Sequence, residues 1–252
     1  MSEITEANKS GRQSGSAVKR WIPPAFLITG LALFFLFDLG QYLSFELLRE
    51  HRFSLLSWVA GHALLAPLLY ITLYIIVIAF SLPGGAVMTV SGGFLFGAVF
   101  GAVYTVLGAT IGATLLFLIA QTSLGAALKE KAGPWLVKMQ DGFNENAMSY
   151  LLVLRLIPIF PFWLVNLAPA FLGVHLRTYF TATLIGIVPG TFVFSLVGAG
   201  LGSVFDAGEE FTLKGVLTPE IIGALVGLAL LSLVPVIYKK FRNDRAKKRE
   251  EA

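Results

Sequence analysis

The chain has 252 residues, of which 56% are hydrophobic and only 13% are charged, and its formal net charge is +4 at pH 7. Soluble domains carry roughly 25% charged residues, so this composition and a mean hydropathy of +0.78 exclude an ordinary soluble domain and indicate an integral membrane protein. The absence of cysteine excludes disulfides, thiolate metal sites and cysteine nucleophiles.

The N-terminal part divides into three predicted segments. Residues 1–20 are rich in Ser, Gly, Asn and Gln and carry four basic side chains, which predicts a disordered basic tail. Residues 21–40 are hydrophobic, are longer than the core of a signal peptide and lack a small-residue cleavage pattern, so we expect a retained membrane anchor helix. In residues 41–61 charged side chains alternate with leucines and a phenylalanine, which predicts an interfacial helix.

The segment 62–205 is predicted to be the main membrane domain. Between Arg52 and Lys129 lie 76 consecutive residues without a charged side chain, whereas one spanning helix needs only about 20 apolar residues. Several passes through the bilayer are therefore expected. The first predicted helix of this domain covers residues 62–80 and is followed by the apolar segment 82–97.

The segment 82–97 is apolar but is interrupted by helix-breaking residues. Glycine in a helix interior costs about 1 kcal/mol relative to alanine, and the residues concerned are Pro83, Gly84, Gly92 and Gly97. Non-helical backbone survives at membrane depth only where protein or a water-filled cavity surrounds it. We therefore expect a re-entrant hairpin here, followed by a spanning helix over 98–122.

A second interrupted apolar segment covers residues 148–173. It contains Pro158 and Pro161 and ends at Gly173, and we expect it to form the second hairpin. A spanning helix over 179–201 follows and is expected to bend at Pro189 and Gly190, as a hinge or as a simple kink.

The paired segments favour an internal duplication in the form of an inverted repeat. In transporters, interrupted segments at corresponding positions of two halves indicate the substrate site. Both chain ends are basic, which predicts that both face the cytoplasm and that the number of crossings is even. Six crossings result if 148–173 passes through the membrane and five if it is a hairpin, and the sequence leaves both open.

The C-terminal part contains an acidic loop and a last transmembrane helix within 206–238, and a basic tail over 239–252. Basic clusters next to a spanning helix set topology and attract anionic headgroups. The tail lacks interleaved aromatic residues, so we expect no nucleic-acid partner.

Arg155 and Asn166 are the candidate substrate-binding residues. An ionisable side chain within a membrane segment is costly and indicates a functional site, and a guanidinium matches phosphate geometry. Two alternatives remain: Arg155 extends to the interface as a snorkelling cation, and Asn166 only caps a broken helix. An amide at this depth needs hydrogen-bond partners under either interpretation.

Enzymatic chemistry is not predicted. The three histidines lack metal-ligand spacing, no H-E-x-x-H motif occurs, and neither a Ser/His/Asp triad nor paired intramembrane carboxylates are indicated. We therefore expect neither a metal nor a cofactor. Asp38, at the end of the first hydrophobic stretch, is the one nearby candidate for proton coupling.

The ordered motifs Gly92-Gly93-Phe94-Leu95-Phe96-Gly97, Arg155-x-x-Pro158-x-x-Pro161 with Asn166 and Gly173, and Pro189-Gly190 resemble the SNARE-associated Golgi protein family, the VTT-domain branch of the DedA superfamily. The resemblance covers roughly residues 60–205. It implies an all-α polytopic helical bundle in which two hairpins face one another, with Arg155 matching the family arginine. DedA proteins carry an acidic residue where this chain has Gly84-Gly85-Ala86, which argues against proton coupling through that carboxylate.

The resemblance implies a lipid transporter or scramblase that moves phospholipid or polyprenyl phosphate between leaflets, with membrane lipids and anionic headgroups as partners. A proton-coupled transporter of a small ion and a membrane scaffold for envelope or vesicle assembly are the alternatives. We expect a multi-pass protein of the cell membrane, with the bacterial plasma membrane favoured. The sequence leaves open whether the protein forms a homo-oligomer.

Overall fold

The computed structural model describes residue 25, residues 27–123, 146–157 and 162–206, and scattered positions between 219 and 234. All regular elements within these residues are helices, and no strand occurs among them. The predicted all-α class is therefore confirmed.

The N-terminal described part is a series of short helices. An apolar helix over Leu27–Leu36 lies within the predicted anchor, and the 3-10 helix η1 (Leu39–Tyr42) follows it. The predicted interfacial helix is divided at His51 into α2 (Phe45–Glu50) and α3 (Arg52–Gly61).

Helix α4 (Leu65–Ala79) follows α3 after a bend of 118°. Helix α5 (Gly85–Ser123) is then interrupted at Gly97, whose φ of 79° and ψ of 168° are not helical. A residue with a side chain rarely adopts such a positive φ, whereas glycine does so without a steric penalty. The break thus lies where the sequence predicts the end of the first hairpin.

The two halves of α5 fold back on each other across this break. A Cβ atom on Gly101 would lie 2.5 Å from the carbonyl oxygen of Gly92 and 2.7 Å from the nitrogen of Gly93. In one straight helix these residues would be more than 10 Å apart at about 1.5 Å per residue. The segment 85–96 therefore runs back along the helix that follows it, while its re-entry into a membrane stays a prediction.

The second half of the domain contains α8 (Ala147–Leu156), α9 (Phe162–Phe171), α10 (Leu176–Gly186) and α11 (Val188–Asp206). Helix α8 ends at Leu156, and the next residue, Ile157, has an extended ψ of 109°, as expected for a residue before proline. Helices α10 and α11 are separated at Ile187. Pro189 lies in the first turn of α11, where its missing N–H is tolerated.

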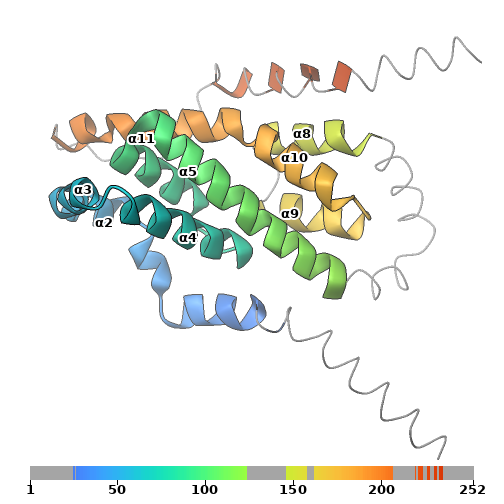
Figure 1. The fold of residues 1–252 in the computed structure, drawn as a ribbon, viewed down its shortest axis with the longest axis horizontal. Helices are drawn as coiled ribbons and strands as arrows, with labels where there is room; N and C mark the ends of the chain where they lie inside the picture. Colours follow the sequence, from blue (N-terminus) through green and yellow to red (C-terminus); the bar gives the residue numbers. More distant parts are fainter. Residues whose placement is uncertain are drawn as a thin grey trace, which may run out of the picture.

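Helix α5 is the centre of the bundle and packs against α4, α9, α10 and α11. Figure 1 shows α4 alongside it, with α8, α9 and α10 gathered toward its C-terminal end. Gly108 and Gly112 lie against the backbone of α4, and Gly93 and Gly198 lie at the crossing of α5 with α11. These small residues allow close approach of the helix backbones.

By length and composition alone, two helical stretches among the described residues could cross a membrane: Gly85–Gln121, which includes the break at Gly97, and Leu176–Asp206, which comprises α10 and α11. A third is reached if α3 and the bent α4 count as one span. The sequence leaves five or six crossings open, and two of those spans, 21–40 and the helix of 206–238, lie partly outside the described residues. The tails 1–20 and 239–252 lie wholly outside them.

The helix crossing at Gly198 gives a stability prediction. A Cβ atom at Gly198 would overlap the carbonyl oxygen of Val90, whereas one at Gly202, a turn later on α11, would meet no atom within 4 Å. We expect Gly198→Ala to lower the free energy of unfolding by about 1–3 kcal/mol through overpacking. Thermal unfolding in detergent micelles measures the difference.

Gly202→Ala is the matched control, because it makes the same chemical change in open space and should leave the melting temperature equal or slightly higher. Equal loss of stability in both variants would contradict the close crossing.

Candidate functional site

Arg155 lies in the last turn of α8, where its positive charge is favourable near the helix C-terminus. Its side chain runs along α10, because Gly186 of α10 has no side chain to separate the two helices. A Cβ atom on Gly186 would lie 2.9 Å from Cβ of Arg155. The guanidinium is thereby directed toward α9 and α10.

Three side chains accept hydrogen bonds from this guanidinium. Nη1 donates to Oδ1 of Asn166 over 2.8 Å, and Nη2 donates to the hydroxyl oxygens of Tyr179 (3.0 Å) and Thr183 (2.9 Å). The guanidinium carbon also lies 5.4 Å from the ring centroid of Tyr179, within cation–π range. All of these partners are neutral, so they orient the guanidinium without cancelling its charge.

Tyr179 connects this cluster to the core helix α5. Its side chain is fully buried, and its ring stacks on Phe117 of α5 with the centroids 4.3 Å apart. Its hydroxyl lies 3.2 Å from Oδ1 of Asn166 and 3.3 Å from the carbonyl oxygen of Ala113, and can donate its proton to either. The arginine on α8 is thus fixed relative to α5, α9 and α10 together.

Two donors of the cluster make no hydrogen bond among the residues that the structure describes. Nε of Arg155 and Nδ2 of Asn166 are buried and make no hydrogen bond within the described part of the chain. Leaving a buried polar group unpaired costs about 1–3 kcal/mol, more for a charged group. Two such groups on neighbouring side chains indicate a site whose hydrogen bonding is completed by something other than the described residues.

Arg155 lines a cavity of about 380 Å³ together with the first interrupted segment. Pro83, Gly84 and Gly85 form one wall, and Gly190 at the start of α11 contributes to another. The hairpin segment, the arginine and the predicted hinge are far apart in the sequence. The fold brings all three to the same cavity.

Hydroxyl groups add polarity to this cavity. Tyr74 and Thr89 both line it, and their hydroxyl oxygens are 2.9 Å apart. Thr89 also donates to the carbonyl oxygen of Gly85 over 2.8 Å. One wall therefore offers a cation and another offers hydroxyl and backbone groups, within otherwise apolar surroundings.

The remaining predicted residues are placed as follows. Asn166 is fully buried behind Arg155, so it is a partner of the arginine in mid-helix and does not merely cap a helix end. Gly92 packs against Tyr70 and Thr105, Gly97 is the break in α5, and Gly173 has a φ of 75° after α9. Pro158 and Pro161 lie outside the described residues.

Tyr179, Thr183, Tyr74 and Thr89 were not singled out from the sequence. For Tyr179 and Thr183 the sequence contains a signal, because these two polar residues are four positions apart in an apolar segment and so lie on one face of α10. Asp38, the candidate for proton coupling, is exposed at the start of η1. The described lining of the Arg155 cavity does not include it.

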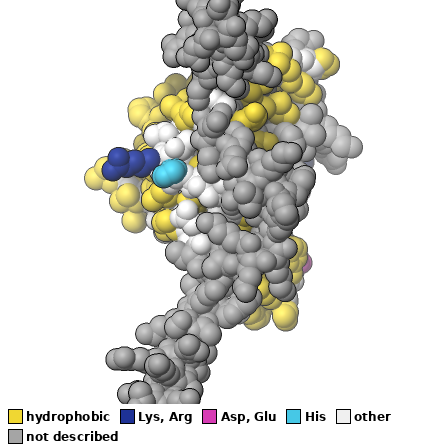
Figure 2. Space-filling model, turned by 90° about the vertical axis from the view of Figure 1, so that its right-hand side faces the viewer, with side chains coloured by type: hydrophobic (Ala, Val, Ile, Leu, Met, Phe, Trp, Pro, Cys, Tyr) yellow, Lys and Arg dark blue, Asp and Glu magenta, His cyan; other side chains and the backbone are white. Residues whose placement is uncertain are grey.

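The surface around these helices is mainly hydrophobic where it is described. Among the side chains that Figure 2 colours by type, yellow ones predominate, with a group of basic atoms next to a histidine. His175 and Arg177, at the start of α10, are both exposed. Arg177 therefore provides an exposed arginine for comparison with the half-buried Arg155.

Comparison with known proteins gives a consistent result. A family model described as the VTT domain matches residues 82–200. Transmembrane protein 41 homolog of Dictyostelium discoideum is 33% identical over 172 residues, which cover 67% of this chain and 49% of that protein. Transmembrane protein 41B of Mus musculus is 29% identical over 175 residues, covering 68% and 58%.

The Caenorhabditis elegans homolog of transmembrane protein 41 is 27% identical over 173 residues, covering 68% of each chain. The matched part of this chain thus spans about half to three fifths of the length of the first relatives. No solved structure matches this chain.

Removing the hydroxyl of Tyr179 tests the cluster. Tyr179→Phe retains the ring stack on Phe117 but takes one acceptor from Arg155 and leaves a buried charge less well paired. We expect it to lower the free energy of unfolding by about 1–3 kcal/mol, measured as a fall in melting temperature in micelles.

Tyr104→Phe is the control, because the Tyr104 ring packs on Phe96 and Phe100 and its hydroxyl makes no hydrogen bond within the described residues. It should leave the melting temperature nearly unchanged. Identical melting temperatures for wild type and Tyr179→Phe would show that the hydroxyl does not hold the arginine.

Proposed function

Because this chain belongs to the VTT domain family of the DedA superfamily and is a membrane protein, we propose that it is a lipid transporter or scramblase. Its substrates would be phospholipids or polyprenyl phosphates, which it moves between leaflets. The observation that carries the proposal is that Arg155 and the first interrupted segment line one cavity.

The charge of the site suits an anionic headgroup. Arg155 is held by three neutral acceptors, so its positive charge is available to a ligand. The buried Nε and the neighbouring Asn166 amide are donors that make no hydrogen bond to any described residue. A phosphate has several strong acceptor oxygens and can satisfy such donors with charge-assisted hydrogen bonds.

The shape of the site suits passage of a headgroup alone. A cavity of about 380 Å³ lies within the range of roughly 300–1,000 Å³ for small-molecule sites. Its polar groups replace part of the hydration that a phosphate loses on entering the membrane. The hydrocarbon chains of the same lipid can stay in the bilayer throughout.

The proposal places this activity in the cell membrane, and the bacterial plasma membrane is the one to examine first. Anionic headgroups are the proposed partners. The interrupted helix α5 supports it further, because broken helices in transporters present backbone groups to the substrate.

Leaflet exchange in liposomes tests the proposal. The purified protein is reconstituted, and the exchange of labelled phospholipid and of labelled polyprenyl phosphate is followed by chemical quenching of the outer leaflet. We expect acceleration for at least one lipid. Arg155→Gln should reduce the rate about tenfold or more, since a hydrogen bond to a charged group is worth about 1.5–3 kcal/mol.

Arg177→Gln is the matched control, because it removes the same charge from an exposed position of α10 and should keep the wild-type rate. Folded wild-type protein that accelerates neither lipid would overturn the proposal. Equal rates for Arg155→Gln and wild type would remove Arg155 from the transport path.

A further inference from the structure

A second cavity, of about 450 Å³, lies on the other side of the first half of α5. Helices α2, α3 and α4 complete its walls. Met88 faces this cavity, whereas its neighbour Thr89 faces the cavity of Arg155. The two cavities are thus distinct sites that share one helix as a wall.

The lining of the second cavity is almost entirely apolar. The side chains that form most of it are Leu43, Leu47, Leu48, Leu55, Leu73, Val87, Met88 and Leu95. Along α5 the lining extends from Val87 to Leu95, which is about 12 Å at 1.5 Å per residue. The lining therefore follows α5 over this length.

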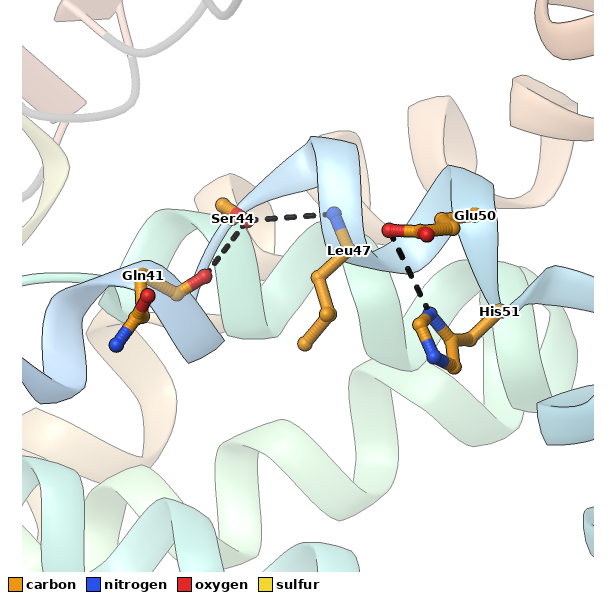
Figure 3. Close-up of polar contacts among 5 residues, drawn as sticks. All are labelled: Gln41, Ser44, Leu47, Glu50 and His51. Atoms are coloured by element: carbon orange, nitrogen blue, oxygen red, sulfur yellow. Dashed lines mark hydrogen bonds and ion pairs between the residues drawn. The ribbon is translucent and has the colours of Figure 1, made fainter.

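Three of the five polar side chains that line this cavity lie on its α2 side, namely Tyr42, Ser44 and His51. The other two are Ser91 of α5 and Tyr70 of α4, and the Tyr70 hydroxyl is hydrogen-bonded to the carbonyl oxygen of Met88 and to Thr105. Figure 3 shows the carboxylate of Glu50 facing the ring of His51; their closest nitrogen and oxygen are 4.0 Å apart, and both side chains are more than half exposed. The cavity thus joins an apolar interior to a polar rim.

The N-terminus of α2 is fixed by Ser44. Its hydroxyl donates to the carbonyl oxygen of Gln41 over 2.8 Å and accepts from the nitrogen of Leu47 over 3.3 Å (Figure 3). This cap fixes Ser44, one polar group of the rim, relative to Leu47.

The outer surface of the helices next to the cavity is apolar where it is described. Large apolar side chains of the adjoining helices are exposed, including Phe53 at 72%, Leu68 at 63% and Leu69 at 54%. In a membrane protein such side chains contact lipid chains, and water is excluded from an apolar space next to them.

We propose that this cavity binds one hydrocarbon chain of a bilayer phospholipid, with the polar end of the lipid beside Ser44 and His51. An amphiphile matches the gradient from polar rim to apolar interior, and an extended chain matches the lining that follows α5. The site goes beyond the proposed function, because it holds a lipid tail and is separate from the headgroup cavity of Arg155.

Photo-crosslinking tests this proposal. The protein is reconstituted in phosphatidylcholine vesicles that contain a phosphatidylcholine with a diazirine near the end of one chain, and adducts are mapped by mass spectrometry. Ordinary lipid contact labels residues in proportion to exposure. A bound chain would label Met88, which is 5% exposed, more than Leu196 of α11, which is 56% exposed.

Two variants that fill the cavity from opposite walls complete the test. Ser91→Phe on α5 and Leu47→Trp on α2 should each reduce adducts at Met88 and Leu95 severalfold, whereas Leu196→Phe on the lipid-facing surface should not. Two filling variants are made so that the test can still be carried out if one of them does not fold.

Labelling that follows exposure alone, or labelling of Met88 that persists in a folded filling variant, would overturn the proposal. The readout does not depend on transport. If the wild-type protein showed no leaflet exchange but Met88 were still labelled, the result would count against the proposed function and leave the tail site intact.

Discussion

The hydrogen bonding of Arg155 to neutral partners is the constraint on which the rest of the site depends. A guanidinium in an apolar domain needs hydrogen-bond partners, and here Asn166, Tyr179 and Thr183 from two other helices accept from its two terminal nitrogens. An acidic partner would have neutralised the charge. Neutral partners fix the direction of the side chain and keep its charge for a ligand, which connects the packing of α8, α9 and α10 to the proposed binding of phosphate.

Glycine positions decide how the rest of the domain reaches this arginine. The break at Gly97 lets the first half of α5 fold back, so that residues 83–86 can reach the cavity of Arg155. The crossing at Gly198 then brings α11 onto the same segment. The first half of α5 also forms a wall of the second cavity. A shift of this half-helix would therefore change both proposed lipid sites.

The sequence predicts some of these features, and physical reasons explain the others. Arg155 stands out because a charge in an apolar run is costly, and the break near Gly97 follows from glycine and proline spacing. Tyr179 and Thr183 resemble ordinary core residues in sequence, because their role arises only when α10 packs against α8. The division of 41–61 into α2 and α3 likewise depends on the local turn at His51, for which the alternation of charged and apolar residues gives no signal.

A double-mutant cycle between Arg155 and Asn166 tests the central claim most directly. The free energies of unfolding of wild type, Arg155→Met, Asn166→Leu and the double variant are measured in one micelle system. If the guanidinium is held by the amide oxygen, the pair should show a coupling energy of about 1.5–3 kcal/mol, as for hydrogen bonds to charged groups. Effects that add to within about 0.5 kcal/mol, as for independent sites, would contradict the account.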